Sequence, residues 1–72
     1  MSQQPIGWQD LEDIAIELYE AHPAVDPLTV KFTELLDWII AIPGFTGQRT
    51  QSNEAKLEAI QMAWLEEWKE NQ

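Results

Sequence analysis

Carboxylates are the reactive side chains that this chain offers in quantity. Asp and Glu number 13 against 4 Lys and Arg, which gives a net charge of −9 on 72 residues. Their spacing matters as much as their number, because at about 100° per residue four acids of the first predicted helix fall within roughly an 80° sector. These four are Asp10, Asp13, Glu17 and Glu20. Exposed carboxylates provide oxygen ligands for hard metal ions and attract a cationic protein surface.

A second group of acids lies near the end of the chain. Glu66, Glu67 and Glu70 fall in the last turns of the final predicted helix, where only Lys69 is positive. Carboxylates at the C-terminal end of a helix oppose its dipole. Two interpretations of these acids stay open: a solvated face that keeps the chain soluble, and a docking face for a basic partner. Acids that oppose the dipole of their own helix favour the docking face. The predicted docking residues are Asp10, Asp13, Glu17, Glu20, Glu66, Glu67 and Glu70.

Other functional classes find little support in the composition. His22 is the only histidine, Ser2 and Ser52 are the only serines, and cysteine is absent. A nucleophile with a base, a thiolate zinc site and cysteine ligation of an iron–sulfur cluster are therefore excluded, and we expect no enzyme. No EF-hand pattern is present, so a metal ion held by these acids would keep most of its water. The negative charge argues against binding of nucleic acid or an anionic membrane.

Helical periodicity defines the element that carries the first acids. A helix is predicted from Gln9 to His22, and it stops there because Pro23 disfavours the α region for the residue before it. The apolar face of this helix comprises Leu11, Ile14, Ala15 and Leu18. Because Asp10, Asp13, Glu17 and Glu20 lie opposite that face, we expect them to point into solvent.

Two further helices are predicted in the middle of the chain. Asp26 is a good N-cap and Pro27 suits a first helical position, which together predict a short helix over Leu28–Phe32. Thr33 is then predicted to cap a third helix, Glu34–Ile42, which Pro43-Gly44 would end. We expect Trp38 on the apolar face of that helix to lie in the core.

The last part of the chain is predicted to be a loop and a long helix. Residues 44–51 are rich in Gly, Thr and Gln, with Phe45 expected to anchor the loop to the core. Ser52 or Asn53 would cap a helix that runs to about Lys69 and buries Trp64. With no convincing strand, we predict an all-α domain of three main helices and one short one, with all 72 residues in a single domain and residues 1–7 flexible. A monomer is expected. A cytoplasmic location is also expected, since neither a signal peptide nor a membrane-spanning run is evident.

Taken together, these residues resemble a known family. The shared features, in chain order, are Trp8, Leu18-Tyr19, Asp26-Pro27, Thr29 to Thr33, Trp38-Ile39, Phe45, Ser52-Asn53-Glu54, Leu57 to Ile60 and Trp64-Leu65. This colinear pattern is similar to the IscX family, small acidic accessory proteins of bacterial iron–sulfur cluster assembly. The resemblance covers about residues 8–67, nearly the whole chain.

The resemblance implies a winged-helix-like fold and binding to a basic patch of a cysteine desulfurase. It also implies weak Fe²⁺ binding by exposed carboxylates, with Asp10, Asp13 and Glu20 at acidic positions of the family's first helix, and no tightly bound cofactor. The implied role is that of an adaptor or regulator of cluster assembly, and the alternative is an iron carrier. One departure is that the family's loop after the third helix is usually rich in aspartate, whereas Pro43 to Arg49 contains no acid. This departure weakens the hypothesis of iron delivery more than it weakens the hypothesis of docking.

Overall fold

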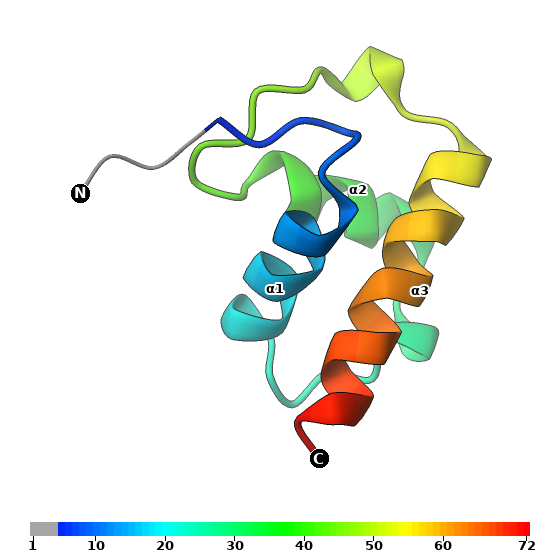
Figure 1. Cartoon of the computed structure of the whole chain (residues 1–72). Helices are drawn as coiled ribbons and strands as arrows, with labels where there is room; N and C mark the ends of the chain where they lie inside the picture. The colour runs from blue at the N-terminus through cyan, green and yellow to red at the C-terminus, as the bar shows by residue number, and fades with distance from the viewer. Residues whose placement is uncertain (1–4) are drawn as a thin grey trace.

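A computed structural model describes residues 5–72 as three α-helices and two short 3₁₀ helices. The α-helices are α1 (Leu11–Ala21), α2 (Phe32–Ile40) and α3 (Glu54–Glu70), and the 3₁₀ helices are η1 (Pro27–Thr29) and η2 (Arg49–Gln51). The helices α1 and α3 lie side by side, and α2 packs against both (Figure 1). The predicted all-α class is confirmed. The only β pairing within residues 5–72 is an isolated bridge between Ile6 and Phe45, and the winged-helix likeness stays a prediction.

The helix α1 ends where the sequence predicts. His22 is the C-cap residue, and its amide donates to the Leu18 carbonyl at 2.9 Å. Ile14, Ala15 and Leu18 are buried, as predicted. The helix begins at Leu11 rather than Gln9, because a turn closed by the Asp10 amide on the Gly7 carbonyl (3.0 Å) precedes it.

The predicted bounds in the middle of the chain are wrong. Asp26 does cap η1, and its carboxylate accepts from the Leu28 amide at 3.0 Å, but η1 ends at Thr29 instead of Phe32. Val30 is the reason, since it turns into the core in an extended conformation and interrupts helical geometry. Thr33 is not an N-cap, because α2 begins at Phe32 with Lys31 as cap residue and ends at Ile40 rather than Ile42.

The loop after α2 is tied to the N-terminal segment, with Phe45 as the anchor that the sequence predicts. The Phe45 ring meets the Trp8 indole edge-on, with ring centroids 5.1 Å apart. The Trp8 Nε1–H donates to the Gln48 carbonyl (3.0 Å), and the Ile6 amide donates to the Gly44 carbonyl (2.9 Å). These bonds hold residues 6–8 against the loop. The prediction of flexibility for residues 1–7 falls partly on residues 1–4, which lie outside the described part.

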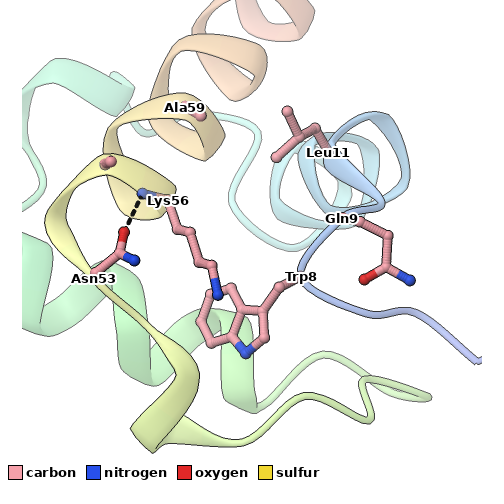
Figure 2. Close-up of a pocket in the computed structure, with 7 residues that line it drawn as sticks. Trp8, Gln9, Leu11, Asn53, Lys56 and Ala59 are labelled. Carbon is pink, nitrogen blue, oxygen red and sulfur yellow. Dashed lines mark hydrogen bonds between the residues drawn. The ribbon is translucent and has the colours of Figure 1, made fainter.

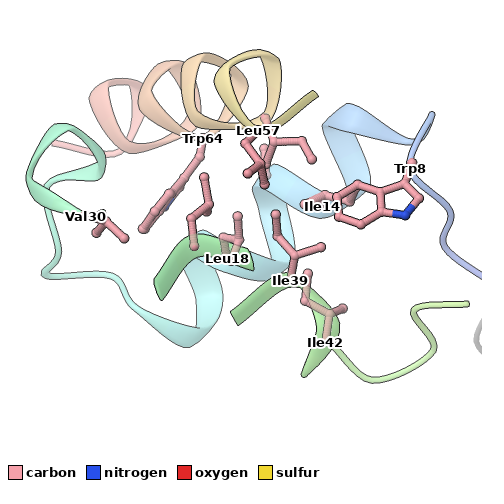
Figure 3. Close-up of a cluster of buried hydrophobic side chains, with 11 residues drawn as sticks. Trp8, Ile14, Leu18, Val30, Ile39, Ile42, Leu57 and Trp64 are labelled. Atoms are coloured by element: carbon pink, nitrogen blue, oxygen red, sulfur yellow. The ribbon is translucent and has the colours of Figure 1, made fainter. Parts of the chain in front are cut away.

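A single apolar core fills the space between the helices (Figure 3). Trp64 of α3 is fully buried, as predicted, and packs with Leu18, Leu35 and Ile39 in that core. Trp38 lies at the edge instead: it is half-buried and meets Trp64 edge-on, with centroids 6.1 Å apart. The helix α3 thus contributes Trp64 to the core. The start of α3 is capped by the Asn53 side chain, which accepts a hydrogen bond from the Lys56 amide at 2.8 Å.

Candidate protein-docking surface

The acids of α1 do not form one uniform surface. Asp10 is the N-cap residue of α1, and its Oδ2 accepts from the Gly7 amide at 2.8 Å, so it has a structural partner. Asp13 and Glu20 are exposed. Glu17 is half-buried, on the flank of α1 that faces α2. Of the four predicted acids, Asp13 and Glu20 are thus the most available to a partner.

Within residues 5–72, hollows lie on two different flanks of α1. At about 100° per residue, Glu12 and Glu17 stand roughly 140° apart around the helix axis. Glu12 lines a hollow between α1 and α3, and Glu17 lines another beside the ends of α1 and α2. The structure therefore places acids of α1 in two different hollows, Glu12 in one and Glu17 with Glu20 in the other.

The hollow between α1 and α3 collects the second group of predicted acids. It has a volume of about 410 Å³ and is lined chiefly by Glu12, Ile16, Ala63, Glu66, Glu67 and Glu70. Ile16 keeps 39% of its surface exposed there. Sequence reasoning missed Glu12, because only the packing of α1 on α3 brings it beside Glu66 and Glu70.

The hollow beside the ends of α1 and α2 has a different character. It measures about 460 Å³ and has mainly apolar walls, including Leu18, Ile42 and Pro43, with Glu17 and Glu20 as its carboxylates. The His22 imidazole stacks on the Trp38 indole at this place, with centroids 3.9 Å apart and planes 15° apart. Nothing in the sequence pattern predicts this stack, which joins a helix terminus to the next helix.

A third hollow lies at the start of α3 and contains no acid. Trp8, Leu11, Lys56 and Ala59 line it, with a volume of about 470 Å³ (Figure 2). The Lys56 Nζ donates to the Gln51 carbonyl at 2.7 Å. Arg49, on the neighbouring η2, forms an ion pair with Asp37 at 2.7 Å. Two of the four cationic side chains thus have internal partners, which disfavours a basic patch for nucleic acid.

The acids do not converge on a metal ion. Within residues 5–72 no group of three or more His, Cys, Asp or Glu side chains could hold one. Asp10, Asp13, Glu17 and Glu20 accordingly offer single carboxylates along a helix rather than a closed set of ligands. Such donors fit only loose association with a hydrated cation.

The described residues form a small acidic helical domain, with exposed carboxylates beside the hollows between its helices. Within residues 5–72 no helix is long and apolar enough to cross a membrane. The chain belongs to the iron-sulphur cluster assembly family, whose sequence model matches residues 6–69. A relative is the uncharacterized protein PA3808 of Pseudomonas aeruginosa, 47% identical over 62 residues that cover 86% of this chain and 94% of the relative.

Proposed function

We propose that this protein is a monomeric cytoplasmic adaptor that regulates iron–sulfur cluster assembly by docking a cysteine desulfurase. The family to which the chain belongs indicates a role in iron–sulfur cluster assembly. The resemblance to the IscX family indicates the cysteine desulfurase as the partner. The observation that carries the docking is the set of exposed α1 acids, which includes Asp13 and Glu20 and forms no ion pair with another side chain of residues 5–72.

Electrostatics explain why such a surface suits docking. The chain carries a net charge of −9, and the acids of α1 and of the α3 C-terminus stand on neighbouring helices. Complementary charge raises the association rate of two proteins and weakens as salt screens it. The docking surface therefore comprises Asp10, Asp13, Glu17, Glu20, Glu66, Glu67 and Glu70, with Asp10 also holding the start of α1.

Charge reversal tests the docking. The double variant Asp13→Lys/Glu17→Lys should weaken binding to a purified cysteine desulfurase by at least about tenfold, equivalent to about 1.4 kcal/mol. The matched control is Glu34→Lys/Glu58→Lys, which makes the same change in net charge at exposed positions of α2 and α3. Titration calorimetry at two salt concentrations measures both. Equal affinity of wild type and the α1 variant would refute the assignment of this face.

Iron is a second, weaker ligand in this proposal. Fe²⁺ associates loosely with Asp10, Asp13, Glu17 and Glu20, as a hydrated ion rather than a chelated one. Residues 5–72 hold no cluster of three metal-ligating side chains, and residues 43–49 contain no acid, which together favour the adaptor over the iron carrier. An anaerobic Fe²⁺ titration followed by backbone amide NMR signals separates the two. Loose association predicts unsaturated shifts confined to α1, whereas saturation at micromolar metal would establish a carrier.

A further inference from the structure

We infer that the hollow beside the ends of α1 and α2 is a seat for a single arginine side chain of a partner protein. The inference deepens the proposed function and rests on it for the identity of the partner. The site comprises Glu17 and Glu20 as anions, Ile42 and Pro43 as apolar wall, and the stacked pair His22 and Trp38.

The electrostatics of this hollow favour a cation. The C-terminal ends of α1 and α2 both reach it, since Ala21 is the last residue of α1 and Ala41 is the C-cap of α2, and both line the hollow. Each helix end carries about half a negative charge. Neither helix has a basic residue in its last turn, so the two dipoles are not offset locally. Glu17 and Glu20 add two formal charges.

The shape and polarity select arginine among cations. A bare metal ion does not fit, because no three-ligand cluster exists in the described residues. The ammonium of lysine is a compact, strongly hydrated charge that an apolar wall does not solvate. The guanidinium is planar and less strongly hydrated, forms paired hydrogen bonds with carboxylates, and stacks on aromatic rings. Its methylene stem can lie along Ile42 and Pro43.

The opposite hollow serves as an internal comparison. Glu12, Glu66, Glu67 and Glu70 make it more acidic, but it has no aromatic wall, and Ile16 is its exposed apolar side chain. If charge alone decided recognition, that hollow would bind a cationic side chain at least as well. Comparing the two hollows therefore distinguishes recognition by shape and charge from attraction by charge alone.

The first test uses small probes and does not need the desulfurase. N-acetyl-arginine amide and N-acetyl-lysine amide are titrated into the full chain while the NMR signals of the Trp38 indole N–H and the Ile42 amide are followed. The arginine probe should shift these signals with an affinity about tenfold higher than the lysine probe. Glu17→Gln/Glu20→Gln should abolish that preference, whereas the charge-matched Glu12→Gln/Glu66→Gln should preserve it. Equal response to both probes, or an unaffected preference in Glu17→Gln/Glu20→Gln, would overturn the inference.

The second test uses the desulfurase and separates the two proposals. Ala41→Leu fills the hollow without changing charge and should weaken binding about tenfold, while Ala24→Leu, exposed outside the hollow, should not. Circular dichroism checks that both variants fold. If Ala41→Leu binds as wild type does, the docking stands and the arginine seat fails. If wild type does not bind the desulfurase, the proposed function fails, and the arginine and lysine titrations alone decide the seat.

Discussion

The imidazole of His22 lies nearly parallel to the indole of Trp38, with their centroids 3.9 Å apart. His22 is the C-cap of α1 and Trp38 belongs to α2, so this one stack joins the end of the first helix to the side of the second. It also leaves Trp38 at the edge of the core, beside the hollow proposed to bind arginine.

Removing the imidazole should loosen that junction. We expect His22→Ala to reduce the free energy of unfolding by about 0.5–1.5 kcal/mol, the usual contribution of an aromatic pair beyond area burial. His22→Phe keeps a flat ring and should retain most of the stability. Urea unfolding followed by tryptophan fluorescence measures both variants. A wild-type midpoint for His22→Ala would show that the stack contributes nothing to stability.

Gly47 should not tolerate a side chain. A Cβ built there would lie 2.6 Å from the Trp8 indole and 2.8 Å from the Phe45 ring, and both rings are held by their mutual contact. Gly47→Ala should therefore cost about 1–3 kcal/mol, as overpacking does. Gly7→Ala is the control, because its close contacts are with the far end of the flexible Gln9 side chain. Thermal unfolding of the two variants should rank Gly47→Ala as clearly less stable.

The two tryptophans late in α3, Trp64 and Trp68, should respond differently to substitution. Trp64 is fully buried, so Trp64→Ala should cost about 3–5 kcal/mol and leave much of the chain unfolded. The indole Nε1–H of half-buried Trp68, like that of Trp64, is shielded from solvent without a hydrogen-bond partner. Trp68→Phe removes that unpaired donor and should change stability by less than about 1 kcal/mol. Chemical denaturation compares them, and equal losses would contradict the placement of the core.

Salt should act oppositely on folding and on docking. With 13 acids and 4 basic residues the folded chain repels itself, and screening that repulsion should raise its melting temperature. The same screening should weaken binding to a basic partner. Melting curves and binding titrations at about 0.01 and 1 M NaCl test both predictions. Between these concentrations the Debye length falls from about 30 to 3 Å. A melting temperature that falls with salt would show that the acids are compensated within the fold.

Local signals were enough for the end of α1, the cap of η1 and the start of α3. The Pro23 stop, the Asp26 cap and the Asn53 start need only short-range backbone geometry and a nearby side-chain acceptor, and the structure has them at or next to the predicted residues. The start of α2 was not predictable in this way. That α2 begins at Phe32, rather than at Glu34 with Thr33 as its cap, depends on where Val30 enters the core, which is a long-range constraint.

The sequence by itself determined the number of main helices, their apolar faces and the large excess of carboxylates, because each follows from residue type and helical period. Only the tertiary structure decided how those carboxylates are distributed over the surface. Packing α1 against α3 on one flank and near α2 on the other sends Glu12 to one hollow and Glu17 to another. The His22–Trp38 stack likewise exists only because the chain brings two helices together, since residues 16 positions apart have no local reason to meet.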